Sequence, residues 1–345
     1  MSVIKSVEVL ERKLNLNLLK NSAVFSFVLF AYPIGIFMLF SAQWLVNLAG
    51  VLVTAEALII SAYLLHELSH WSLFKSPKTN KTWGTVLSWV NGSCYSTFKE
   101  IRDKHMHHHA DRADVLTFNV QHLMRDMPTA ARNLIKILEW MYIPAIEILM
   151  HFLVIILPFI KSEWHHKRLR LTIIFLLRAS IFFLMAWVSV KAWLLYLLAY
   201  CVMLTALRFA DAFQHTYDVF LESDLAQFGG KVKDGKLRDR AYEQANTYSN
   251  LASLKYPWLN LLFLNFPYHN AHHEKPKVPW HQLPALHKKL YGDLDLLPVI
   301  PMIKLMSAYH CHRITRLQSD DYGVISNASA NAFIGAAGVS FLTAL

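Results

Sequence analysis

Four long apolar segments constrain the fold of this chain more than any other feature. They cover about residues 22–42, 44–65, 171–190 and 192–210. A transmembrane helix needs about 20 predominantly apolar residues, and segments of this length can cross the hydrocarbon core of a bilayer. The chain has 345 residues, of which 54% are hydrophobic and only 17% charged. It is therefore predicted to be an all-α integral membrane protein in which residues 1–345 form a single domain.

The four segments form two pairs, each joined by a short turn near residues 41–44 or 190–193. Each pair predicts a tight helical hairpin. The two turns carry only one basic residue, Lys191, whereas lysine and arginine recur in the segments that flank the hairpins. Basic flanks remain on the cytoplasmic side of a membrane. Both termini are therefore predicted to be cytoplasmic, with residues 66–130 and 211–345 forming a helical cap on that side.

Several other segments have weaker signals. Residues 140–160 are apolar, but Glu147 and His151 make a crossing costly, so 131–160 are predicted to be an interfacial or re-entrant pair of helices. An apolar stripe in residues 1–20 predicts a separate helix lying on the membrane surface. The charged, glycine-containing region 222–250 predicts a surface loop with a helix. The tail, residues 332–345, is too short to span and is expected to pack on the cap.

Charge and cysteine usage indicate the location. The net charge is +10, but most basic residues flank apolar segments, so attraction to an anionic membrane face explains them better than nucleic acid binding. Cys94, Cys201 and Cys311 are far apart and predict neither a disulfide framework nor a CxxC site. The polar regions are therefore expected to face a reducing compartment. A bacterial inner membrane is favoured over the endoplasmic reticulum, because the compact chain has no fused electron-transfer domain.

Three clusters of histidine carry the chemistry. Their sequences are His66-Glu-Leu-Ser-His70, His105-Met-His-His-His109 and His269-Asn-Ala-His-His273. Residues at i, i+3 and i+4 of a helix share one face, so each cluster can aim two or three imidazoles at one point. Imidazole binds iron, zinc and copper, and eight converging rings are more than one ion can use. The sequence predicts a dinuclear metal centre with His66, His70, His105, His108, His109, His269, His272 and His273 as ligands, whereas His107 would point away.

This pattern resembles the membrane fatty acid desaturase family, which includes related hydroxylases and alkane monooxygenases. The family is marked by three histidine boxes, one of HxxxH type followed by two of HxxHH type. Residues 265–280 also look like its third-box region, and the resemblance covers roughly residues 20–300. It implies four spanning helices under a cytoplasmic cap and a non-haem centre of two iron ions that alternate between Fe2+ and Fe3+. It also implies oxidation of a fatty acyl chain with dioxygen as co-substrate.

Members of this family commonly have a ninth histidine just past the fourth span, and His215 occupies the matching position. A histidine that caps a helix at the membrane edge is the alternative. Ligating imidazoles usually need their other N–H held by an acceptor. The carboxylates that could fill this role are Glu67, Asp103, Asp111, Asp114 and Asp211, with ordinary surface carboxylates as the alternative. No catalytic residue beyond the metal ligands is predicted.

The electrons must come from another protein. The chain has no GxGxxG fingerprint, no paired CxxC motifs and no recognisable haem domain. A separate donor of ferredoxin, rubredoxin or cytochrome b5 type, with its reductase, is therefore expected. Desaturation is the favoured reaction; a hydroxylase, or an oxidative decarboxylase forming a terminal alkene, is the alternative within the enzyme class. A metal transporter is disfavoured, because transporters place their ligands near the bilayer midplane and these clusters flank the spans.

Overall fold

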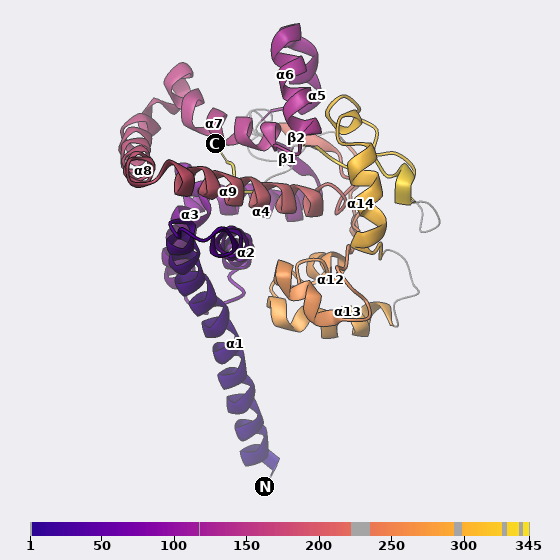
Figure 1. The fold of residues 1–345 in the computed structure, drawn as a ribbon. Coiled ribbons are helices and arrows are strands. Elements are labelled where there is room, and N and C mark those ends of the chain that lie inside the picture. Colours follow the sequence, from indigo (N-terminus) through magenta and orange to yellow (C-terminus); the bar gives the residue numbers. More distant parts are fainter. Residues whose placement is uncertain are drawn as a thin grey trace.

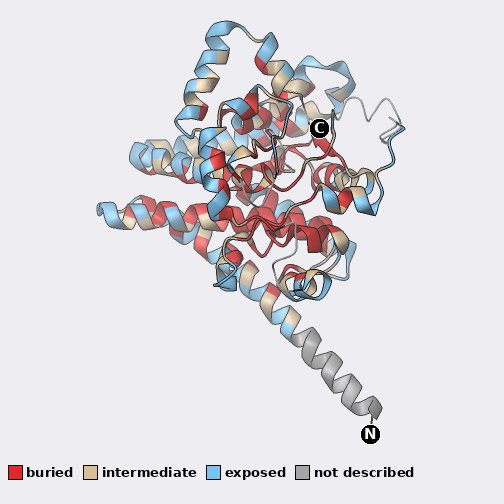
Figure 2. Ribbon diagram, turned by 90° about the vertical axis from the view of Figure 1, so that its right-hand side faces the viewer, coloured by how far each residue is buried: buried red, intermediate tan, exposed pale blue. Residues whose placement is uncertain are grey.

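The computed structural model describes residues 2–116, 118–221, 235–292, 299–325, 330–337 and 341–344, with side chains from residue 16 onward. Helices make up most of this part of the chain. The long helix α1 projects from the body and carries the N-terminus at its far end (Figure 1). Buried residues gather in the middle of the molecule, and exposed residues cover the outer helices (Figure 2).

Four helices are long and apolar enough to cross a membrane, as predicted. They are α1 (Ser2–Leu39), α2 (Trp44–Ser69), α8 (Arg168–Val188) and α9 (Val190–Asp211). The amide of Asn47 closes the turn between α1 and α2 by donating to the carbonyls of Met38, Leu39 and Ser41. Ser189 caps α9 by accepting from the Ala192 amide. Lys191 Nζ donates to Asn47 Oδ1 at 3.1 Å, so the two turns lie together.

Helix α2 is the central element of this bundle. Almost all its residues from Thr54 to Ser69 are buried, whereas on α8 only Leu171 and Ile174 are. Glycine permits the close contact between α1 and α2, since a Cβ on Gly35 would lie 2.5 Å from Thr54 Oγ1. Small residues at such contacts let helix backbones approach closely. The apolar outer faces of α1, α8 and α9 suit contact with lipid.

The segment between α2 and α8 contains α3 (Pro77–Asn91), η1 (Ser93–Tyr95), α4 (Phe98–Asp111), β1 (Asp114–Leu116), α5 (Val120–Asp126), α6 (Thr129–Trp140), α7 (Ala145–Ile160) and η2 (Ser162–Lys167). Helices α6 and α7 form the pair predicted for 131–160, and α7 is shorter than the four spanning candidates. Glu139 and Glu147 are buried and pair with Arg208 of α9, with Glu147 Oε2 3.2 Å from the guanidinium. The single positive charge of Arg208 therefore offsets one of these two carboxylate charges inside the protein.

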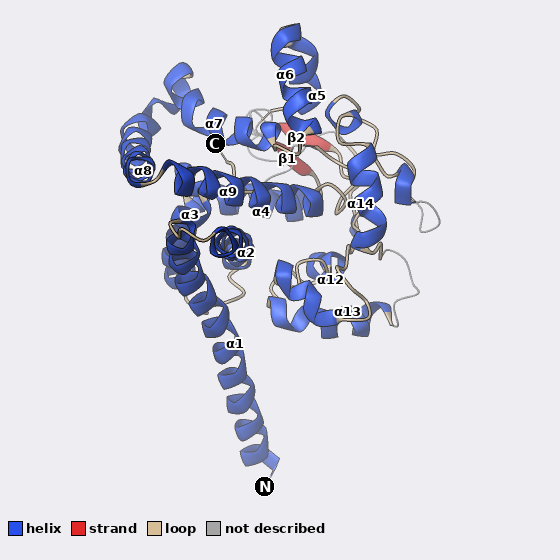
Figure 3. Ribbon diagram, viewed as in Figure 1, coloured by secondary structure: helices blue, strands red, loops and turns tan. Residues whose placement is uncertain are grey.

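The remaining elements follow α9 along the chain. They are β2 (Val219–Leu221), α11 (Arg240–Ala245), η3 (Pro257–Phe263), α12 (His269–Glu274), η4 (Trp280–Gln282), α13 (Leu283–Tyr291), α14 (Met302–Cys311), η5 (Thr315–Leu317) and η6 (Ala330–Ala332). Strands β1 and β2 pair in parallel, with Asp114 opposite Val219 (Figure 3). The all-α prediction therefore needs one correction, a two-stranded sheet that joins the end of the α4 segment to the segment after α9.

Two further predictions need correction. Residues 1–20 do not form a separate surface helix, because α1 continues without a break from Ser2 to Leu39. At 1.5 Å per residue this helix is about 57 Å long, almost twice the hydrocarbon thickness of a bilayer. In region 222–250, residues 222–234 lie outside the described part, and α11 is the helix predicted there. The helix is not confined to the surface, because its Glu243 is only 1% exposed.

Candidate metal centre

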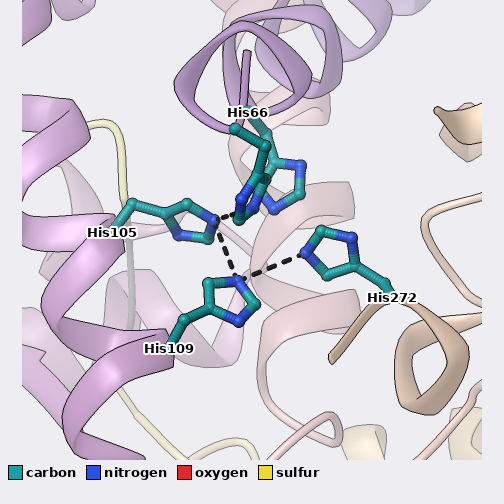
Figure 4. A group of neighbouring side chains, drawn as sticks. His66, His105, His109 and His272 are labelled. Atoms are coloured by element: carbon teal, nitrogen blue, oxygen red, sulfur yellow. Dashed lines mark hydrogen bonds between the residues drawn. The ribbon is translucent and has the colours of Figure 1, made fainter. Parts of the chain in front are cut away.

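Four separate parts of the chain bring the predicted histidines together. The C-terminal end of α2 carries His66 and His70, and α4 carries the second cluster. His215 follows α9, and the six-residue helix α12 carries the third cluster. Helix α4 is fixed at its start by a capping box, in which Thr97 and Glu100 each bind the other's backbone N–H. Figure 4 shows rings from α2, α4 and α12 pointing toward a common centre.

Five rings form what we call the first histidine group: His66, His70, His105, His109 and His272. One ring nitrogen from each lies within 4.8 Å of the others. The Nε2 atoms of His70 and His105 are 2.7 Å apart, those of His105 and His109 are 3.2 Å apart, and those of His109 and His272 are 3.3 Å apart. Two nitrogen ligands that each lie about 2.1 Å from one ion are separated by about 3.0–3.4 Å, so most of this spacing suits a shared metal.

The second histidine group contains His108, His215, His269 and His273, again with ligand atoms within 4.8 Å of one another. The Nε2 atoms of His215 and His269 approach to 2.6 Å. The two groups adjoin, because the ring centroids of His109 and His273 are only 4.2 Å apart. All nine predicted histidines therefore lie in two neighbouring groups. The ring of His107 is outside both, with its Nδ1 2.9 Å from an Asp111 oxygen.

Burial sets the protonation state of these rings. Loss of hydration, with repulsion from neighbouring rings, lowers the pKa of His70, His105 and His109 well below the usual value. The same causes lower the pKa of His215, His269 and His273 well below the usual value. Burial lowers the pKa of His272 to about 3. A neutral imidazole has a lone pair free for a metal. Neutral pH therefore favours the ligating form of these seven rings.

Unpaired nitrogen atoms show that these residues fit a metal. Both ring nitrogens of His66 and Nε2 of His273 are buried and have no hydrogen-bond partner among the described residues. A buried polar atom left unsatisfied costs about 1–3 kcal/mol, and native proteins contain few of them. His66 belongs to the first group and His273 to the second, and coordination to a cation in each group would satisfy these atoms.

Glu243 of α11 contacts the second group and was missed by the sequence analysis. Its Oε1 lies 3.1 Å from His273 Nδ1, and its Oε2 accepts from Arg112 Nε at 2.8 Å and from Arg240 at 2.6 Å. A carboxylate on the far nitrogen of a ligating histidine fixes the ring's orientation and raises its basicity. Glu243 has no sequence signal, since it lies 30 residues before His273 in a charged region.

Three of the predicted carboxylates lie beside the histidines. Asp114 is fully buried, and its Oδ1 is 3.1 Å from His108 Nδ1. Asp211 lines the cavity next to His215. Glu67 accepts from the backbone N–H of Trp280 at 3.1 Å, and its Oε1 is 3.8 Å from His66 Nδ1. Glu67 also accepts from the Ser72 hydroxyl at 2.7 Å, and its contact with Trp280 ties α2 to the segment that follows the third cluster.

The other two carboxylates do not contact either group in the described structure. Asp111 pairs with His107, and Asp103 forms an exposed ion pair with Lys99. Both sit on the face of α4 that turns away from the metal candidates. They are close to the second cluster in sequence, but the turn of the helix directs their side chains away from its ligating histidines.

Two hollows reach the histidines. A small cavity, which we call the inner cavity, is lined by five histidines of the two groups together with Asp211, Gln214, Phe266 and Phe341, among others. A larger hollow of about 570 Å³, the basic cleft, reaches His70 and His109. The cleft is bordered by three cations, Arg102, Lys275 and Lys277, and by the apolar residues Trp71, Met106, Pro276 and Val278.

The comparisons with known proteins agree with this geometry. Residues 42–301 match the family described as fatty acid desaturase, which is about three quarters of the chain and contains all nine histidines. No curated protein and no solved structure matches the chain.

Proposed function

The chain belongs to the fatty acid desaturase family, and from this premise we propose that it is a membrane di-iron oxidoreductase that desaturates a fatty acyl chain. The observation that supports the proposal most strongly is the division of nine histidines into adjoining groups of five and four. Two groups of this size can hold one ion each. Nitrogen-only ligands also bind zinc, but zinc has no redox chemistry and offers no route to oxidation of a C–H bond.

Two iron ions, when bound, would supply the redox chemistry that activates dioxygen and removes hydrogen from an unactivated methylene. In the net reaction, two hydrogens leave adjacent carbons, and dioxygen takes them with two donor electrons and two protons. The products are one double bond and two waters. The protein holds the ligands through Glu243 and Asp114, and it must place one part of a flexible chain beside them.

The inner cavity is the proposed place of the reacting carbons. Five histidines from both groups line it, so a chain segment there would lie next to both metal positions. Phe266 and Phe341 supply apolar walls on which methylene groups can pack. Asp211 and Gln214 add polar groups at the same wall, within reach of any water or proton that enters the site.

The membrane arrangement follows from the four apolar helices. The turns after α1 and after α8 lie together through the Lys191–Asn47 contact, whereas His66, His70 and His215 lie at the opposite ends of α2 and α9. We propose two hairpins under a cap that carries the histidines. Because the basic segments adjoin the cap, the positive-inside rule assigns it to the cytoplasm. A bacterial inner membrane remains the favoured location.

An external electron donor is part of the proposal. The three cations of the basic cleft favour an acidic partner, since complementary charge speeds encounter and suppresses wrong partners. Trp71 lies at this cleft next to His70 and is 43% exposed. It has a positive φ of 56°, which is rare for a bulky residue, and Arg102 lies 4.2 Å from its ring centroid. A donor seated here would approach the first histidine group closely.

Lipid analysis of cells that express the chain tests the proposed function. New unsaturated acyl chains should appear with the intact protein and disappear with His108→Ala, which removes a member of the second group. The matched control is His107→Ala, which removes an adjacent histidine outside both groups and should retain activity. New hydroxylated lipids would assign the chain to hydroxylation, and new terminal alkenes to decarboxylation. No change in lipids would contradict the proposal.

A further inference from the structure

A short C-terminal segment, residues 341–344, lies inside the protein beside the metal candidates. Leu342, Thr343 and Ala344 are each no more than 2% exposed. Leu342 and Ala344 belong to the same core cluster as α2 residues such as Leu64 and Leu68. We call residues 341–344 the strap. Earlier in the tail, Ala336 N donates to Ala212 O at 2.8 Å, just after the end of α9.

Specific polar contacts hold the strap against α4 and the residues just before it. The Ser96 hydroxyl donates to Ala344 O at 2.7 Å and accepts from Ala344 N at 3.0 Å. Lys104 Nζ donates to Thr343 O at 2.6 Å. Ser96 and Lys104 are themselves buried. The strap is therefore fixed in position by the protein interior and is not a loosely attached tail.

Phe341 is the strap residue that faces the site. Its ring centroid is 5.8 Å from that of His66 and 6.1 Å from that of His105, both in the first histidine group. It also lines the inner cavity, where the other large apolar wall is Phe266 of the third-box region. Phe266 contacts His66 and His269 and belongs to the main core. Phe341 packs against the same core from the strap and is only partly buried, so it forms the cavity wall opposite the third-box region.

We propose that the strap forms one wall of the acyl site and that Phe341 is a specificity-determining residue. Its ring limits how far an acyl chain extends past the reacting carbons. This inference rests on the proposed function, because it assigns the inner cavity to the acyl chain. Each methylene that gains or loses a buried position changes binding by about fourfold. A wall made by one aromatic ring is therefore enough to select chain length.

The test is a competition among saturated acyl chains that differ by two carbons, using purified full-length protein in detergent with bound iron. Phe341→Ala should shift the preferred substrate to longer chains, with a change of about tenfold or more in the ratio of rates for neighbouring lengths. Phe341→Trp should shift it to shorter chains, and Phe341→Leu should lie between Ala and the wild type. Ser96→Ala loosens the strap without altering the cavity lining. It should therefore broaden the range of accepted chain lengths without shifting the preference to shorter chains.

Iron content and thermal unfolding of each variant establish that the site is intact, and Ser96→Ala and Phe341→Leu keep the test decisive if Phe341→Ala does not fold. An unchanged length profile in these folded variants, with an active wild type, overturns the inference. A wild type that oxidises none of the acyl chains instead contradicts the proposed function. The two failures are therefore distinct.

Discussion

Replacing Glu243 by glutamine should weaken metal binding at the second histidine group. The carboxylate lies 3.1 Å from His273 Nδ1 and accepts from Arg112 and Arg240. Glutamine has one acceptor oxygen, so it cannot serve both the histidine and the two arginines, and its NH2 group would face a donor. Loss of an outer carboxylate of this kind typically costs 10–100-fold in metal affinity or activity. That range corresponds to about 1.4–2.7 kcal/mol.

The assay is the iron retained per chain after dialysis against a graded series of chelator concentrations. The chelator midpoint of Glu243→Gln should fall by about 10–100-fold relative to the wild type. Glu274→Gln is the matched control, because Glu274 lies 3.6 Å from Arg240 and has no contact with a histidine of either group in the described structure. Its midpoint should be unchanged. Equal retention by wild type and Glu243→Gln would refute the role assigned to this carboxylate.

Two further predictions concern the donor and pH. Reversing the charge of Lys275 or Lys277 in the basic cleft to Glu should slow donor-dependent turnover at low salt, and the difference should shrink at high salt because screening weakens steering. Lys289→Glu, outside that cleft, is the control, and equal slowing by all three variants would count against the cleft. The metal-free protein should lose unfolding free energy as pH falls from about 6.5 toward 3. In that range the unfolded chain protonates His272, whereas the folded chain, with a pKa of about 3, does not. The slope is up to about 1.4 kcal/mol per pH unit for each such histidine, and a flat denaturation profile between these pH values would contradict it.

The membrane helices could be predicted from sequence because length and hydropathy are local properties. Segments 44–65 and 192–210 correspond closely to α2 and α9. The continuation of α1 could not be predicted in this way, since an amphipathic stripe is compatible with a separate helix or an extension of the next one. The short β1–β2 pairing also escaped prediction, because three-residue strands carry almost no pattern.

The histidine spacing predicted that the rings converge, but not how they divide between two groups. On α4, His105 and His109 join the first group and His108 the second, whereas on α12 His269 and His273 join the second group and His272 the first. Each HxxHH cluster therefore contributes to both groups, with the roles of its positions exchanged. This follows from how α4 and α12 face each other, a tertiary relation that no local spacing contains.

Contacts made by residues remote in sequence were also hidden. Glu243 becomes a partner of His273 only because α11 packs beside α12, and Phe341 reaches His66 only because the tail returns to the core. Neither residue has a spacing or composition that marks it. The carboxylates chosen for their closeness in sequence to the histidines gave a mixed result: Asp114 lies against His108, whereas Asp111 turns to His107.

The metal content of the purified protein tests the central claim most directly. Mass spectrometric analysis of iron and zinc, normalised to protein by amino-acid analysis, should give close to two irons per chain. That result is expected because five and four histidines form two adjoining groups. One zinc with no iron, or a single ion of any kind after full reconstitution with ferrous iron, would contradict the account.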